Sequence, residues 1–271
     1  MLKSRLCIAF FAFAVGCAPA QKPLTDYVNP MLGTATLWDS VDLGFKPTKR
    51  TWGAEVFPGS SLPNAMVQVS PVTKFHSGAG YQYEDSVIYG FTHTNKGHWN
   101  LCHIPLLPVT GTPTPGDYCS PFSHERESAA PGYYQVFLDR YGVDAQLSST
   151  LRCAFHKYTY PAGAAASLLA DLQRSNEHVR AWDIRKEGDN VFAGWQQTGE
   201  KMYFYAVANR PVTGIEPVVE GDREVRIVRF GEGDGALELR IGFSFVSEKN
   251  ARENLEAEML GKSFAEVRSE A

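Results

Sequence analysis

From Tyr133 to Val246 the sequence is an uninterrupted series of short segments in which apolar and polar residues alternate. Alternation with a period of two places apolar side chains on one face of a β-strand. Turn residues separate these segments at 139–142, 188–190 and 231–235, and each turn is typical of a β-hairpin. No helical pattern lies between them. The series therefore favours an all-β fold, an antiparallel β-sandwich, over a parallel α/β sheet.

Length and composition agree with one large sandwich domain. The chain has 271 residues, 44% of them hydrophobic and 21% charged, which is typical of a globular protein rather than a disordered one. Before the long series, residues 66–72 (MVQVSPV) predict a further strand that Pro71 ends. We expect the sandwich to occupy residues 21–246.

The first twenty residues are typical of an export signal. Lys3 and Arg5 precede the apolar stretch LCIAFFAFAVG, which is too short to span a bilayer. The residues APA before Gln21 suit cleavage by a signal peptidase, whereas AVGC makes Cys17 a candidate lipidation site. Both alternatives predict a bacterial protein of the periplasm or an outer-membrane lipoprotein. Cys17 as an ordinary residue of the apolar stretch is a third interpretation.

Charge and cysteine usage narrow the class of partner. The net charge of -4 gives no basic footprint for nucleic acid. Outside the predicted signal only Cys102, Cys119 and Cys153 remain, and an odd number cannot complete a disulfide framework. Either one disulfide and one buried thiol or three free thiols would fit.

Two short helices are predicted at the C-terminal end, over residues 247–271. Ser247 is a helix N-cap before EKNARENLEAEML, and Gly261 ends that helix. Ser263 and Glu266 then form a capping-box pattern. Helices this short need a surface to pack against. They would be either a frayed end docked on the sandwich or a linker to a helical domain, and we expect the linker.

Residues 90–111, GFTHTNKGHWNLCHIPLLPVTG, contain His93, His98, Cys102 and His103. A zinc site would need tightly paired ligands that converge on a tetrahedron. Adjacent residues of an extended chain point to opposite faces, so Cys102 and His103 fit such a site poorly. Buried, hydrogen-bonded histidines or the rim of a ligand pocket are the better interpretations.

The rim hypothesis rests on the loop NKGHWN between two strand-like segments. Binding residues often lie on such loops. The indole of Trp99 could stack on the apolar face of a sugar, with Asn95, Asn100 and His98 as hydrogen-bonding groups. The predicted substrate-binding residues are His93, Asn95, His98 and Trp99. An equally simple interpretation makes Trp99 a core residue beneath the loop.

No catalytic residue can be assigned from the sequence. There is no G-x-S-x-G elbow, phosphate-binding loop or dinucleotide fingerprint. Asp171, Glu177 and Asp183 are scattered and are predicted to be solvated or capping carboxylates. No pair of carboxylates for general acid and base chemistry is evident.

Several segments in register resemble the N-terminal domain of glycoside hydrolase family 92, a family of exported bacterial exo-acting α-mannosidases. The segments are YVNPMLGT (27–34), FPGSSLPNAMVQVSPVT (57–73), GYQYEDSVIYGFTHT (80–94), SHERESAAPGYYQVFLDRYGVDAQLSSTLRCAFHKYTYP (123–161) and GFSFVSEKNARENLEAE (242–258). His93 matches the family pattern. The chain departs from it at NKGHWNLCH, at Asn64-Ala65 and at Val72, which puts linkage specificity in question.

This resemblance implies a galactose-mutarotase-like sandwich joined by helices to an (α/α)6 catalytic barrel, in cis or in trans. It also implies calcium-dependent, inverting hydrolysis of terminal α-mannosides of the α-1,2 type in mannose-containing glycans. An inverting pair of carboxyl groups is about 6.5–9.5 Å apart, which leaves room for water. The resemblance assigns these carboxylates and most calcium contacts to the barrel, so this chain alone is expected to be inactive.

Two other functions remain open from the sequence. One is a stand-alone carbohydrate-binding lipoprotein, anchored to the membrane only through Cys17. The other is a metalloprotein that uses His93, His98 and Cys102.

Overall fold

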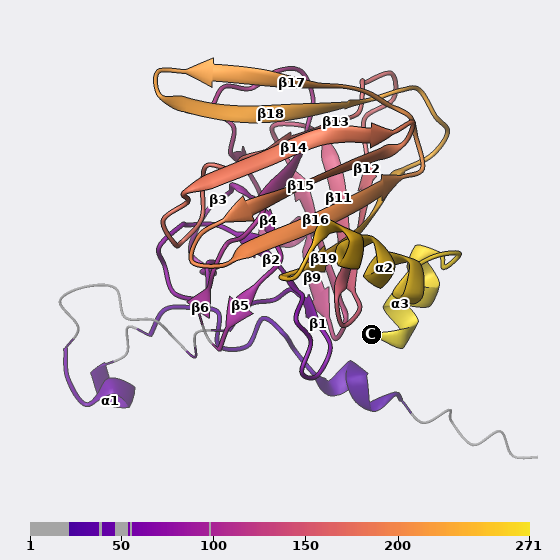
Figure 1. The fold of residues 1–271 in the computed structure, drawn as a ribbon. Coiled ribbons are helices and arrows are strands. Elements are labelled where there is room, and N and C mark those ends of the chain that lie inside the picture. Colours follow the sequence, from indigo (N-terminus) through magenta and orange to yellow (C-terminus); the bar gives the residue numbers. More distant parts are fainter. Residues whose placement is uncertain (1–21, 38–39, 47–53, 55, 98) are drawn as a thin grey trace, which may run out of the picture.

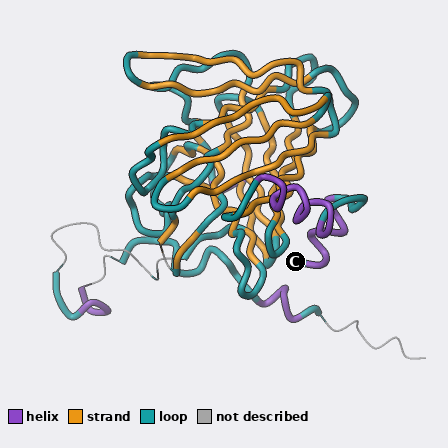
Figure 2. The backbone as a smooth tube through the Cα atoms, viewed as in Figure 1, coloured by secondary structure: helices purple, strands orange, loops and turns teal. Residues whose placement is uncertain are grey.

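The computed structural model describes residues 22–37, 40–46, 54, 56–97 and 99–271. The predicted signal, with Cys17, lies outside these residues, and so does His98. Two antiparallel sheets form a sandwich, and one apolar core contains buried residues from both. Figures 1 and 2 show that strands make up the body of the molecule, with the two C-terminal helices at one side. The predicted all-β sandwich is confirmed.

One sheet has seven strands, and its spatial order is far from the sequence order. The order is β1 (Ser60–Ser61), β2 (Gln68–Val72), β4 (Gly90–Thr92), β7 (Leu106–Val109), β13 (Ser167–Ala170), β18 (Arg223–Phe230) and β17 (Val212–Glu220). The segment that continues from β4 carries the residues predicted to bind substrate, so this sheet positions the candidate site.

The second sheet has eight strands. The order is β14 (Ala181–Gly188), β15 (Val191–Gln197), β16 (Lys201–Ala208), β19 (Leu237–Ser244), β12 (Cys153–Thr159), β11 (Val143–Ser149), β10 (Tyr133–Leu138) and β9 (Glu127–Ala130). Smaller elements are η1 (Leu24–Tyr27), α1 (Ser40–Leu43), η2 (His124–Arg126) and the strand pairs β3 (Val87–Ile88) with β8 (Ser120–Pro121) and β5 (Asn95–Lys96) with β6 (Trp99–Asn100).

The predicted hairpins at 139–142 and 188–190 are confirmed as β10–β11 and β14–β15. The one at 231–235 is wrong, because β18 pairs with β13 and β17 whereas β19 lies in the other sheet between β12 and β16. Glycines there do mark a change of direction, but the chain crosses between the sheets. Strand β2 also continues through Pro71 to Val72, since at Pro71 only β4 pairs with it.

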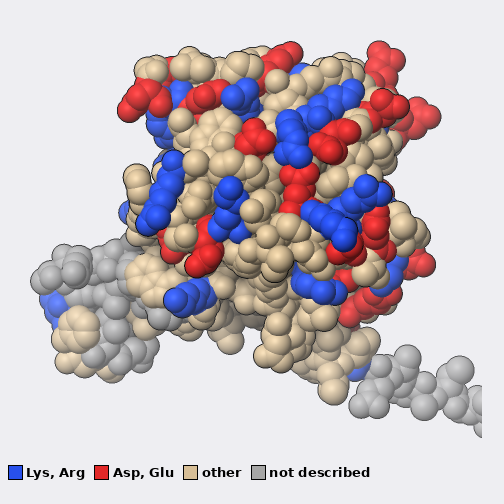
Figure 3. Space-filling model, in the orientation of Figure 1, with Lys and Arg blue, Asp and Glu red and all other residues tan. Residues whose placement is uncertain are grey.

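Strand β17 lies at one edge of the seven-stranded sheet, and strand β14 lies at one edge of the eight-stranded sheet. Strand β17 contains Pro217 and the exposed Glu220. Strand β14 carries the exposed Arg185, Lys186 and Glu187, and its register shifts between Lys186 and Gly188. Figure 3 shows acidic and basic side chains interspersed over this face of the molecule.

Helices α2 (Glu248–Glu258) and α3 (Phe264–Glu270) begin as predicted. The Ser247 hydroxyl accepts a hydrogen bond from the Asn250 amide, and Ser263 with Glu266 forms the capping box. They cover the outer face of the eight-stranded sheet through a separate cluster of Tyr133, Cys153, Phe155, Leu255, Met259, Phe264 and Val267. A Cβ on Gly242 would lie 2.1 Å from the Ala251 carbonyl oxygen, so this glycine lets α2 lie close against β19.

Cys102, Cys119 and Cys153 are free thiols. Of the two alternatives drawn from the sequence, three free thiols is therefore correct, rather than one disulfide and one thiol. In the described part of the chain, no helix is both long and apolar enough to cross a membrane.

Candidate functional site: the β5–β6 hairpin and its support

Strand β4 leads through two buried residues into the small β5–β6 hairpin. The backbone of Gly97 at its tip has φ +60°, a conformation that glycine adopts readily. Trp99 is 46% exposed, so it is a surface residue and not a core anchor. Asn95 is half-buried, and its Oδ1 and Nδ2 are buried without a hydrogen-bond partner among the described residues. A buried amide in this state is an available donor and acceptor.

Asn100 anchors the base of the hairpin. Its Oδ1 accepts hydrogen bonds from the Thr92 hydroxyl at 3.2 Å and from the Cys102 amide at 2.7 Å. Its carbonyl accepts one from Asn176 Nδ2 at 2.6 Å. Asn176 belongs to the loop between β13 and β14, so that loop and the hairpin are joined directly.

Cys102 and Ile104 both have left-handed backbone conformations, with φ 54° and 53°. A β-branched residue rarely adopts this conformation, and such strain costs about 1–3 kcal/mol and needs external support. Gln196 supplies it: its Oε1 accepts from the Ile104 amide at 2.8 Å while its Nε2 donates to the Leu172 and Arg174 carbonyls. The kinked backbone fixes the direction of His103.

His103 joins the hairpin to two further elements. Its Nε2 lies 3.0 Å from Glu177 Oε2 and 3.1 Å from the Thr198 hydroxyl, which itself donates to Glu177 at 2.7 Å. Burial lowers the pKa of His103, although Glu177 acts in the opposite direction. The hydrogen bond from Thr198 is the main cause that lowers the pKa of Glu177. A neutral His103 therefore donates to a Glu177 carboxylate at neutral pH.

His93 is fully buried and lies behind the hairpin. Its ring packs against Phe243, and its Nδ1 is 3.4 Å from the His103 carbonyl oxygen. Burial lowers the pKa of His93 to about 3, so the imidazole is neutral. His93 therefore contacts the segment after the hairpin through the backbone of His103.

The exposed side chains that result are Lys96 and Trp99 from the hairpin and Glu177 from the neighbouring loop, with the half-buried Asn95 beside them. The side chain of Glu177 is 43% exposed, and Lys96 is close enough to contribute to lowering its pKa. An aromatic face, an amide, a carboxylate and an ammonium group together suit a polyhydroxylated ligand.

The sequence missed Glu177, because its partner His103 lies 74 residues away and no spacing pattern links them. The prediction that Asp171 is solvated is wrong. Its carboxylate is fully buried and accepts hydrogen bonds from the Tyr118 hydroxyl at 2.7 Å and from Arg223 at 2.6 Å. Asp183 is partly exposed beside Arg185.

A family model described as the glycosyl hydrolase family 92 N-terminal domain matches residues 27–252. The chain belongs to glycosyl hydrolase family 92. A comparison with curated proteins found no match.

Solved structures of family 92 enzymes have the same fold. The chain is 26% identical to the α-mannosidase BT3965 from Bacteroides thetaiotaomicron, with a TM-score of 0.79, covering 93% of this chain and 37% of that one. BT3965 in complex with mannoimidazole gives 25% identity and a TM-score of 0.77, over 92% and 36% of the two chains. The inverting mannosidase BT2199 from Bacteroides thetaiotaomicron VPI-5482 matches at 22% identity and a TM-score of 0.74, over 92% and 36%. The chain thus spans about a third of these enzymes.

The described residues do not fit a calcium site of their own. In the ranges that the structure describes, no three His, Cys, Asp or Glu side chains converge as metal ligands would. The metalloprotein hypothesis named three ligands. Of these, Cys102 is buried and its thiol hydrogen-bonds Thr92, and His93 is buried against Phe243. His98 lies outside the described residues.

Proposed function

We propose that this chain is the N-terminal domain of an exported, calcium-dependent, inverting α-mannosidase that acts on terminal α-1,2-linked mannose of glycans. The observation that carries the proposal is the family 92 N-terminal model over residues 27–252. The mannosidase structures that share the fold support it, one of them in complex with mannoimidazole.

In this proposal the β5–β6 hairpin forms the edge of a mannose pocket that a C-terminal catalytic domain completes. Clefts between domains are common ligand sites. The exposed ring of Trp99 stacks on the apolar face of a mannose unit, while Asn95 and Glu177 bind hydroxyl groups. His98, which lies outside the described residues, is proposed as a further contact. His93 and His103 act as positioning residues, because they hold the strained backbone behind the hairpin.

The chemical step is assigned to the catalytic domain, which supplies the general acid, the general base and the calcium ligands. Two carboxylates considered from the sequence are held by other groups of this chain: Asp171 is buried against Arg223, and Glu177 accepts from His103 and Thr198. The sandwich therefore binds and orients the glycan, and the N-terminal segment directs export.

The direct test joins the chain to the catalytic domain and follows α-1,2-mannobiose by NMR. We expect hydrolysis that releases β-mannose first and that stops when a chelator removes calcium. The chain alone should hydrolyse nothing. Hydrolysis by the chain alone, or retention of the anomeric configuration by the two-domain protein, would contradict the proposal.

A separate experiment tests export. Expression in a bacterium with labelled palmitate should give a labelled, membrane-associated protein that becomes unlabelled when Cys17 is replaced by Ser. An unlabelled periplasmic protein would instead favour cleavage before Gln21.

A further inference from the structure

A cleft away from the β5–β6 hairpin lies at the edge of the sandwich, where the edge strands β14 and β17 approach each other. Its volume is about 470 Å³, and it is lined by Gln173, Val179, Arg180, Ala181, Trp182, Asp222 and Arg223. Small-molecule sites have volumes of about 300–1,000 Å³, so the cleft is large enough for a sugar unit.

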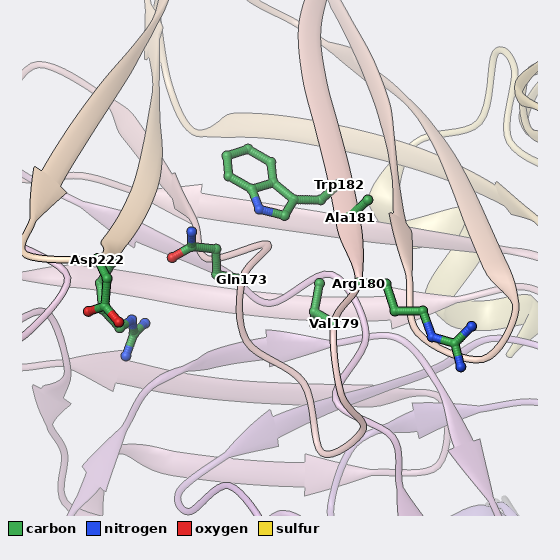
Figure 4. Close-up of a pocket in the computed structure, with 7 residues that line it drawn as sticks. Gln173, Val179, Arg180, Ala181, Trp182 and Asp222 are labelled. Atoms are coloured by element: carbon green, nitrogen blue, oxygen red, sulfur yellow. The ribbon is translucent and has the colours of Figure 1, made fainter.

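Figure 4 shows how the lining side chains are directed. The indole of Trp182 and the amide of Gln173 point toward the side of the cleft that carries Asp222, whereas the guanidinium of Arg180 points away. Trp182 is half-buried and Asp222 is exposed. One wall therefore offers an aromatic face and an amide, and the opposite wall offers a carboxylate.

The walls are held in place by contacts outside the cleft. Arg223 donates at 2.6 Å to the fully buried Asp171, and Gln173 Oε1 accepts from the Glu224 amide at 2.7 Å, which leaves the Gln173 NH2 group to face the cleft. The Arg226 guanidinium lies 5.3 Å from the centre of the Trp182 ring and is paired with Glu224 at 2.7 Å. A site whose side chains are already fixed loses little entropy on binding.

Two buried polar atoms next to these walls have no hydrogen-bond partner among the described residues: Asp171 Oδ1 and Arg226 Nε. Such atoms are unusual in a native structure and ordinarily indicate a bound water or ligand. Asp171 accepts a hydrogen bond from the lining residue Arg223, and Arg226 lies over the ring of the lining residue Trp182.

The charges select the class of ligand. Arg223 is neutralised by Asp171 and Arg226 by Glu224, while the negative charge of Asp222 at the rim is matched by Arg180, whose guanidinium points away from the cleft. No excess of positive charge is left for a phosphate or a carboxylate. An aromatic face with balanced hydrogen-bonding groups instead suits a neutral pyranose.

We infer that this cleft is an accessory carbohydrate-binding site that takes a neutral hexose unit of the glycan, separate from the pocket edge at Trp99. The inference rests on the proposed glycan-directed function. The loop between β13 and β14 connects the two places, because Gln173 and Val179 line the cleft while Asn176 and Glu177 hold the β5–β6 hairpin. Binding at both would keep a branched glycan on the protein.

The test is a titration of the full chain, labelled with ¹⁵N, with α-1,2-mannobiose. Each tryptophan gives one indole N–H signal, and Trp182→Phe identifies the signal of Trp182. We expect this signal to shift in a saturable way, and Asp222→Asn to weaken binding about tenfold, as loss of a hydrogen bond from a sugar hydroxyl to a charged group does. Asp234→Asn, an exposed turn aspartate on another loop, is the matched control and should bind like the wild type. Trp99→Ala should leave the shift of the Trp182 signal unchanged.

The outcomes separate this inference from the proposed function. If only the Trp99 signal shifts, the accessory site is overturned and the pocket-edge hypothesis is supported. If the Trp182 signal shifts but Asp222→Asn and Asp234→Asn weaken binding equally, the assigned cleft is wrong. No shift at Trp182 at saturating sugar overturns the inference, whatever the activity of the two-domain enzyme.

Discussion

His93 Nε2 lies 3.1 Å from His156 Nε2, and this contact joins the two sheets through the core of the sandwich. His93 follows β4 of the seven-stranded sheet, and His156 belongs to β12 of the eight-stranded sheet. His156 Nδ1 is 2.5 Å from the Tyr158 hydroxyl. With the Tyr158 O–H donating to His156 and His93 Nδ1–H donating to the His103 carbonyl, both imidazoles are neutral and each bond has one donor.

The His93–His156 pair should make the free energy of unfolding decrease in mild acid. Burial lowers the pKa of His93 to about 3 and that of His156 in the same direction, whereas both take up protons near pH 6.5 when unfolded. The stabilisation is complete above that pH and decreases as pH falls toward the folded pKa. As the pH falls from about 7.5 to 5.5, protonation of the unfolded chain at each histidine should lower the free energy of unfolding by roughly 1 kcal/mol, measurable by urea denaturation. The double variant His93→Phe, His156→Phe should lose most of this pH dependence, the remainder coming from the buried His103, and the exposed-site control His178→Gln should keep it.

Gly242→Ala should destabilise the protein by about 1–3 kcal/mol, as overpacking in a tight contact does. The added Cβ would lie 2.8 Å from the Leu255 Cβ as well as close to the α2 backbone, so the helix has to move away from β19. Gly214→Ala is the control, because its Cβ would meet nothing within 4 Å. Equal urea midpoints for the two variants would show that α2 is not held closely.

Trp99→Ala, in the enzyme that carries both domains, should raise KM for α-mannosides about tenfold, because an exposed aromatic anchor is lost. The thermal midpoint should hardly change, since Asn100 holds the base of the hairpin. Trp195→Ala on β15 is the control for tryptophan truncation elsewhere. Unchanged kinetic constants in Trp99→Ala would remove the hairpin from the binding site.

Glu177→Gln should lower the pKa of His103 further. Burial already lowers it, and the hydrogen bond and charge of Glu177 oppose that effect. Histidine ring signals followed by NMR during a pH titration report the change. Glu187→Gln, an exposed carboxylate on β14, should leave His103 as it is. A His103 pKa that does not respond to Glu177→Gln would contradict the hydrogen bond at 3.0 Å.

What could be predicted from the sequence is what depends on neighbours along the chain. The Ser263–Glu266 capping box and the turn after Gly188 involve residues a few positions apart, and both are confirmed. The turn near Gly233 was predicted, but the sheet that β19 joins was not. Apolar and polar residues alternate along β19 in the same way whichever sheet the strand belongs to.

The candidate site depended on contacts that sequence spacing does not encode. Trp99 and Asn95 were found from their loop context, and their role in binding stays a prediction. The hydrogen bonds of Glu177 and Asp171 were not predicted, because their partners, His103 and Arg223, lie 74 and 52 residues away. The left-handed backbone at Ile104 also could not be predicted, since that position holds neither glycine nor asparagine, the residues that commonly adopt this conformation.

The edge strands have a consequence for how copies of the protein meet. An exposed strand edge invites another strand to pair with it, and natural sheets discourage this with proline, charge and irregular register. Pro217 on β17 lacks an N–H, and β14 carries three charged residues in a row before its register shift. Sheet extension from one molecule to the next is therefore discouraged at both of these edges, so at these strands copies of the protein can reach a high local concentration without polymerising.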